Sequence, residues 1–156
     1  MYYLDEQYIV QEYGYTESIG WFQGQTGSLK AKANPLSSLA AIAYVDQEGI
    51  HLRVYYQGEC NLSPSNCPPV ETAKEAKTSI IKELAYDGSW YTGEMQIKDP
   101  VEGTGLAAVT YAADGFRQIR VYYQTFEELY LKEYCHNNKG WFTGEFIGPV
   151  GTLSSP

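Results

Sequence analysis

Two arginines occupy the same place in a repeated sequence pattern, and each is followed by a glutamate at a matching place. The pairs are Arg53 with Glu83 and Arg120 with Glu133. A guanidinium group offers five N–H donors in a rigid fork, and a carboxylate accepts two or more hydrogen bonds. A tryptophan beside such a pair adds a flat apolar surface. Together these groups suit a neutral ligand with hydroxyl pairs on its edge and a C–H face.

Each repeat also has a tryptophan near its end, namely Trp21, Trp90 and Trp141. A structural interpretation competes with ligand binding. In that interpretation each Arg and Glu forms an ion pair between strands, and each Trp fills the gap between sheets. For the arginines we favour ligand binding, because each recurs with its glutamate. For the tryptophans both interpretations stay open.

The chain repeats itself with a period of about 50 residues. Leu39–Tyr44 returns as Leu106–Tyr111, an offset of 67, and Trp90–Glu94 returns as Trp141–Glu145, an offset of 51. The two offsets differ because a segment of about seventeen residues follows Gln57 in the second repeat. An internal period of this length is typical of repeat architectures.

The length of 156 residues fits one domain. We divide this domain, 1–156, into repeats at 1–34, 35–99 and 100–156, with an insertion at 58–78 in the second. The first repeat lacks its first strand. The chain therefore holds about two and two-thirds repeats.

The sequence predicts an all-β fold in which each full repeat forms four strands. In the third repeat these are Leu106–Thr110, Ile119–Gln124, Leu129–Tyr134 and Trp141–Phe146. Four strands per period of 40 to 50 residues are typical of a β-propeller blade. A β-sandwich-like packing of the same sheets is the alternative. Glu71–Thr78, inside the insertion, is predicted to form a short helix.

The order of the motifs resembles the blades of the Aleuria-type fungal fucose-specific lectins. The motifs are Leu-Ala-Ala-(Ile/Val), (Ile/Leu)-Arg-Val-Tyr-Tyr-Gln, (Ile/Leu)-Lys-Glu and (Gly/Ser)-Trp-(Tyr/Phe)-Thr-Gly, and they cover almost the whole chain apart from the insertion. In that family six blades close a ring, and fucose binds between adjacent blades. An Arg and a Glu come from one blade, and an aromatic wall comes from the next. The resemblance implies a non-catalytic lectin for fucosylated or related glycans.

Carried over residue by residue, the resemblance places one site within the chain. Arg53 and Glu83 of the second repeat would meet Trp141 of the third. The first repeat offers Glu12 against Trp90, but it has no arginine at the matching place. The first repeat therefore departs from the family pattern.

A second site would need a partner chain. Arg120 and Glu133 can find the tryptophan of a following blade only in Trp21 of another copy. Closed propellers have about four to eight blades, so two and two-thirds blades do not close a ring. We therefore expect self-association, most simply a homodimer with C2 symmetry and six blade-like units.

Composition narrows the class of partner. The formal net charge is −8 and the basic residues are scattered, which argues against nucleic acid. Nowhere in the sequence do eighteen apolar residues follow one another, so we expect no membrane insertion. The N-terminus lacks the pattern of a signal peptide. We therefore expect a cytoplasmic protein. His51 and His136 lack the spacing of a zinc site, and we expect no metal or cofactor.

Three cysteines leave one question open. Cys60 and Cys67 lie in the insertion with six residues between them, and Cys135 lies in a strand-like segment. An odd count without a signal peptide favours free thiols over a Cys60–Cys67 disulfide.

Two other function classes were weighed. A glycoside hydrolase needs two carboxylates with different roles. Each full repeat offers one matched glutamate, Glu83 or Glu133, beside an arginine that should keep it ionised and unfit as an acid. We therefore predict no enzyme activity. A protein-interaction propeller is the remaining alternative, favoured if the Arg and Glu side chains are paired with no open cleft.

Overall fold

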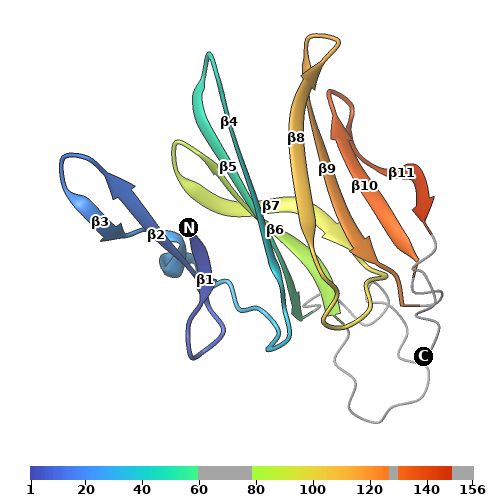
Figure 1. Ribbon diagram of the computed structural model, residues 1–156, viewed down its shortest axis with the longest axis horizontal. Coiled ribbons are helices and arrows are strands. Elements are labelled where there is room, and N and C mark those ends of the chain that lie inside the picture. Colours follow the sequence, from blue (N-terminus) through green and yellow to red (C-terminus); the bar gives the residue numbers. More distant parts are fainter. Residues whose placement is uncertain (60–78, 127–129, 149–156) are drawn as a thin grey trace, which may run out of the picture.

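The chain folds into three separate antiparallel sheets that stand side by side in chain order (Figure 1). The computed structural model describes residues 1–59, 79–126 and 130–148. Within these residues the regular structure is all β apart from one short 3-10 helix, η1 (Thr26–Leu29). The expected all-β class is confirmed.

Each sheet is a meander of consecutive strands. The first contains β1 (Tyr2–Leu4), β2 (Val10–Thr16) and β3 (Gly20–Gln23). The second contains β4 (Leu39–Asp46), β5 (Gly49–Glu59), β6 (Ser79–Asp87) and β7 (Trp90–Ile97). The third contains β8 (Ala107–Ala113), β9 (Phe116–Gln124), β10 (Leu131–Asn137) and β11 (Gly140–Gly148). The four strands expected in the third repeat are present, with bounds shifted by a few residues.

The first sheet lacks the strand that the sequence lacks. Tyr2 of β1 lies opposite Glu12 of β2, as Tyr122 of β9 lies opposite Glu133 of β10. Strand β1 therefore corresponds to the second strand of a blade. The sheets are therefore arranged as propeller blades, as predicted, and not as the two sheets of a β-sandwich.

The core lies in two layers, one on each face of the second sheet. Val54 on β5 packs in a cluster with Val10 toward the first sheet, whereas its neighbour Tyr55 packs in a cluster with Val121 toward the third. All four side chains are fully buried. Successive residues of a strand point to opposite faces, so one strand supplies both layers. The second sheet is therefore covered on both sides.

The first and third sheets each leave large apolar side chains exposed. These are Tyr15, Ile19 and Trp21 in the first sheet and its hairpin, and Val109, Tyr111 and Phe116 in the third. Exposed apolar patches commonly mark interaction sites.

Some sequence predictions lie outside the described residues. These are the Cys60–Cys67 question and the helix at Glu71–Thr78. Cys135 on β10 is a buried free thiol, and burial raises its pKa to about 11. In the part of the chain that is described, no helix is long and apolar enough to cross a membrane.

Candidate functional site

The structure brings each predicted arginine together with its glutamate. Arg53 on β5 and Glu83 on β6 face the third sheet, and Arg53 Nε lies 3.7 Å from Glu83 Oε1. Arg120 on β9 and Glu133 on β10 repeat this geometry at 3.5 Å. The Arg53 and Glu83 side chains are only 12% and 6% exposed. We call these two places the second-repeat site and the third-repeat site.

Trp141, at the start of β11, lies in the interface beside the second-repeat site. Its indole stacks on Tyr134 with ring centroids 5.6 Å apart, and it meets the edge of Tyr55 at 6.2 Å. Tyr55 lies directly opposite Glu83 on the neighbouring strand. Trp141 also packs against the core cluster, as the structural interpretation expects, and its role as a ligand wall stays a prediction.

Asp87, at the end of β6, is a site residue that the repeat pattern did not single out. Its two carboxylate oxygens accept hydrogen bonds from both terminal nitrogens of Arg53, at 2.9 and 3.1 Å. Arg53 also donates to the carbonyl oxygens of Leu52 and Tyr86 and to the Tyr44 hydroxyl. This bidentate clamp fixes the guanidinium plane. The Nε edge of Arg53 faces Glu83 at 3.7 Å, which is within ion-pair distance but longer than a hydrogen bond.

Further groups hold Asp87 in place. His51 bridges Asp87 and Asp46 through its two ring nitrogens, with Nε2 2.8 Å from Asp46 Oδ1. The Tyr91 hydroxyl donates to the second oxygen of Asp87. Burial alone would raise the pKa of Asp87, but hydrogen bonds from Arg53, Tyr91 and His51 outweigh burial and lower the pKa to about 2. Asp87 is therefore ionised throughout the physiological range.

The protonation expected for Glu83 is wrong. We expected the arginine to keep this carboxyl ionised, but burial raises the pKa of Glu83 to about 7, and the attraction of Arg53 offsets burial only in part. The cause is burial, which removes water from the carboxyl group and so favours its neutral form.

The third-repeat site keeps the pair but lacks the clamp. Asn137 stands at the place of Asp87, fifty residues on. Arg120 still donates to two backbone carbonyl oxygens, at 2.8 and 3.4 Å. Its terminal nitrogens otherwise have only Gln118 Oε1, 3.5 Å from each. The terminal donors of Arg120 are therefore less fully used than those of Arg53.

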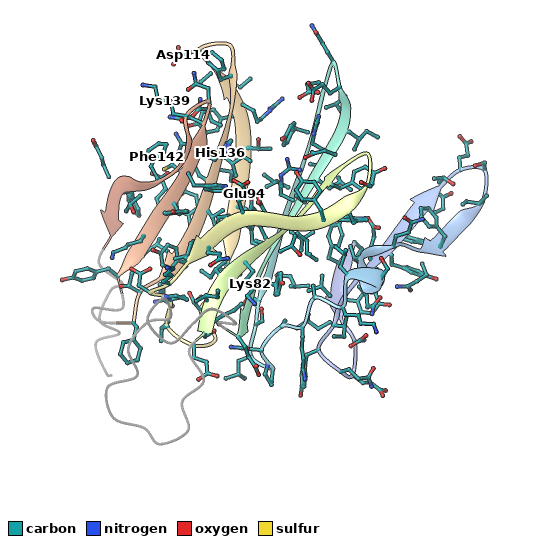
Figure 2. The ribbon with its side chains drawn as sticks, turned by 180° about the vertical axis from the view of Figure 1, so that it is seen from behind. Lys82, Glu94, Asp114, His136, Lys139 and Phe142 are labelled. Carbon is teal, nitrogen blue, oxygen red and sulfur yellow. The ribbon has the colours of Figure 1, made fainter. Side chains whose placement is uncertain are left out.

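The arginine of the third-repeat site lines a cavity of about 430 Å³, whereas Glu133 does not line it. Arg120, Tyr111 and Asn137 line it, and the Arg120 guanidinium lies 5.4 Å from the centroid of the Tyr111 ring. Figure 2 shows Asp114 and Lys139, which also line the cavity, at the tips of the third sheet's hairpins. The described part of this chain places no further sheet over that face.

Trp90 and Trp21 lie in different surroundings. Trp90 Nε1 donates to Glu12 Oε2 at 3.3 Å, and its ring meets the edge of Tyr2 at 5.9 Å. The first-repeat glutamate thus already accepts a bond from the indole. Trp21 stacks on Tyr13 but is 59% exposed, at the open side of the first sheet.

A glycine that recurs in each repeat lies against the glutamate of that repeat. Three residues after each tryptophan stands a glycine, where a Cβ would overlap the glutamate of the same repeat: Gly24 with Glu12, Gly93 with Glu83, and Gly144 with Glu133. The last strand must approach the carboxyl group closely, which only glycine permits here. The Trp-x-x-Gly spacing was therefore a signal for the site.

Two four-stranded antiparallel sheets and one three-stranded sheet, each built from consecutive strands, are the arrangement of β-propeller blades. The family model "Fungal fucose-specific lectin" matches residues 1–64. A fucose-specific lectin of Aspergillus fumigatus is 26% identical over 145 residues, which cover 91% of this chain and 40% of that protein. The chain thus spans less than half the length of this relative.

Solved structures show the same blades. The six-bladed propeller of Aleuria aurantia lectin aligns with 97% of this chain and 43% of its own, at 27% identity and a TM-score of 0.74. A mutant of that lectin was solved in complex with alpha-methyl-L-fucoside. A fucose lectin chain from Kordia zhangzhouensis aligns over 94% of this chain and 97% of its own, at a TM-score of 0.55 and 22% identity. These findings confirm the resemblance to the fungal fucose-specific lectin family and the β-propeller fold.

Proposed function

We propose that this chain is a non-catalytic lectin that binds fucose, or a similar deoxyhexose, on glycans. The observation that carries the proposal is the Arg–Glu pair, built twice at 3.7 and 3.5 Å on equivalent strands. The relatives named fucose-specific lectins support the choice of sugar.

The chemistry of the second-repeat site suits a neutral sugar. Glu83 already accepts a hydrogen bond from the backbone N–H of Met95. An ionised Glu83 would offer its remaining acceptor positions to a sugar hydroxyl, while the Nε edge of Arg53 donates to a sugar oxygen. Trp141 offers its ring to the C–H face. Because Asp87 already holds the far side of Arg53, the arginine loses little freedom on binding.

For assembly we propose a homodimer whose two copies supply six sheets. One outer sheet exposes Trp21, and the opposite outer sheet exposes the cavity at Arg120. Trp21 of the partner would then complete the third-repeat site. Light scattering should give twice the mass of the chain, and a stable monomer would contradict the ring.

One observation calls for a comparison with glycoside hydrolases. Glu83, with a pKa of about 7, and Asp87, with a pKa of about 2, resemble an acid and base pair. However, both oxygens of Asp87 are engaged by Arg53, His51 and Tyr91. Asp87 is therefore unable to activate water or attack a sugar. A fucosylated oligosaccharide should be bound and recovered uncleaved.

A glycan array tests the function as a whole. We expect signals confined to glycans that carry fucose or a close analogue. Binding only to unfucosylated glycans would contradict the proposed sugar. A complete lack of glycan binding would favour a protein-interaction propeller.

A further inference from the structure

A second cavity, of about 360 Å³, lies between the second sheet and the segment that follows the first. Three lysines line it, Lys30, Lys32 and Lys82. Lys82 is adjacent to Glu83 on β6, so the two side chains point to opposite faces of the sheet. Figure 2 shows Lys82 well below His136, toward the other end of the sheets. We call this place the lysine cavity, and neither Arg–Glu pair lines it.

The matching place at the other interface holds a complete ion pair. Lys132 Nζ donates to Asp99 Oδ2 at 3.1 Å, and the Tyr123 hydroxyl donates to Asp99 Oδ1 at 2.8 Å. Lys132 lies opposite Tyr123 in the third sheet, as Lys82 lies opposite Tyr56 in the second. One lysine and one tyrosine thus recur at both interfaces, and in one of them an aspartate joins them.

Lys32 takes the place of that aspartate in the lysine cavity. The segments leading into β4 and β8 make the same backbone hydrogen bond, from Asn34 and from Val101, to the glutamine near the end of β5 and of β9. Two residues before these donors stand Lys32 and Asp99, respectively. The repeat therefore replaces an acceptor with a third cation.

The charges in the lysine cavity are unbalanced. Its lining includes the three lysines and one acid, Glu59, which gives 3 − 1 = +2. Among the described residues, none of the three ammonium groups forms a hydrogen bond or an ion pair. Lys82 is partly buried; burial lowers its pKa, and Glu59 opposes that effect. A cationic hollow in a chain of net charge −8 attracts anions locally.

We propose that the lysine cavity binds a small oxyanion, a sulfate or carboxylate group of the kind that acidic sugars carry. The anion supplies the negative acceptor that Asp99 supplies at the other interface, and it lies between Lys82, Lys32 and the Tyr56 hydroxyl. This site goes beyond the proposed function, because it uses neither Arg–Glu pair.

An NMR titration with sodium sulfate, at constant ionic strength against chloride, tests the proposal. We expect saturable shifts at Lys30–Lys32 and at Thr92–Gln96, on the two walls of the cavity. Lys32→Asp should weaken sulfate binding by at least about tenfold, because its carboxylate pairs with Lys82 as Asp99 pairs with Lys132. Lys82→Met should have the same effect by removing the partly buried cation.

The matched control is Lys132→Met, which removes the equivalent lysine from the interface that already has its aspartate. It should leave sulfate binding unchanged. Shifts that do not saturate, or equal binding in wild type and Lys32→Asp, would overturn the proposal. Methyl α-L-fucoside should bind wild type and Lys32→Asp alike, so failure of this site and failure of the sugar sites are told apart.

The source of the anion follows from a second titration. N-acetylneuraminic acid and galactose 6-sulfate are compared with galactose and with inorganic sulfate. Tighter binding of an acidic sugar than of inorganic sulfate would support a glycan group as the ligand. Binding of galactose equal to that of its sulfate ester would contradict recognition of the anion.

Discussion

The second and third repeats place the same Arg–Glu pair on equivalent strands, yet the two pairs have different surroundings. Arg53 is clamped by Asp87 and covered by the next sheet, whereas Arg120 has Asn137 nearby and faces an open cavity. The repeat unit therefore builds the pair. The rigidity of the arginine and the cover over the pair come from residues that vary between repeats.

This difference separates two contributions to binding. A clamped arginine loses little conformational freedom when a ligand arrives, so more of its hydrogen-bond energy appears as affinity. A loosely held arginine offers more free donors but must be ordered first. The predictions below test whether the clamp, the cover or the pair itself determines sugar binding.

The largest expected effect separates Trp141 from Trp21. Trp141→Ala should lower the free energy of unfolding by about 3 kcal/mol, because the indole packs on Tyr55, Tyr134 and the core cluster. Trp21→Ala should cost about 1 kcal/mol or less, because Trp21 is 59% exposed and packs on the partly exposed rings of Tyr13 and Tyr15. Urea denaturation of both variants measures the contrast.

Calorimetry with methyl α-L-fucoside extends the test on Trp21. If the partner's Trp21 forms the wall of the third-repeat site, Trp21→Ala weakens that site only. A folded Trp21→Ala protein that keeps both sites at full strength would contradict the shared site. A variant that no longer folds would show that Trp21 is a packing residue.

The clamp gives the next largest effect. Asp87→Asn converts the second-repeat site to the third-repeat arrangement and should weaken sugar binding there by roughly tenfold, because Arg53 loses two charged hydrogen bonds. Asn137→Asp is the reverse change and should tighten the third-repeat site by supplying Arg120 with a clamp. Equal affinities in wild type and Asp87→Asn would show that the clamp has no role in binding.

The pH dependence of the second-repeat site is smaller in effect. Ionised Glu83 accepts charge-assisted hydrogen bonds from sugar hydroxyls, which the protonated carboxyl group accepts more weakly. With a pKa of about 7 for Glu83, affinity should therefore fall by up to about tenfold between pH 8 and pH 6. Glu83→Gln should remove this dependence along with most of the affinity. Affinity at this site that is constant from pH 8 to pH 6 would contradict a role for ionised Glu83.

The raised pKa of Glu83 also determines the direction in which the stability of the fold changes with pH. The pKa of Glu83 is raised from 4.5 to about 7 on folding, so its contribution is fully present below pH 4.5 and is lost as pH rises through 7. Wild type should therefore lose stability relative to Glu83→Gln between pH 5 and pH 8. Parallel unfolding curves of the two proteins over this range would contradict the buried state of the carboxyl group.

Sequence reasoning found the parts of the site that recur. Arg53, Glu83 and Trp141 could be predicted because each has a counterpart one repeat away, and strand alternation then places Arg53 and Tyr55 on one face. Gly93 carried the same information, because a Cβ there would overlap Glu83.

The parts that do not recur were missed, for physical reasons. Asp87 has Asn137 as its counterpart, so repetition gave no signal for the clamp. The pKa of Glu83 depends on how deeply its carboxyl group is buried, which strand patterns do not quantify. The bond from Trp90 to Glu12 depends on the packing of the first sheet against the second.

The most direct test of the central claim is calorimetric titration of wild type, Arg53→Ala and Arg120→Ala with methyl α-L-fucoside. The claim is that each Arg–Glu pair is a separate sugar site. Wild type should bind two sugars per chain, and each single variant should lose one site and keep the other. Loss of the charged hydrogen bonds should cost about 1.5 to 3 kcal/mol each at the altered site. A protein that carries both Arg53→Ala and Arg120→Ala and still binds two sugars per chain with wild-type affinity would contradict the claim.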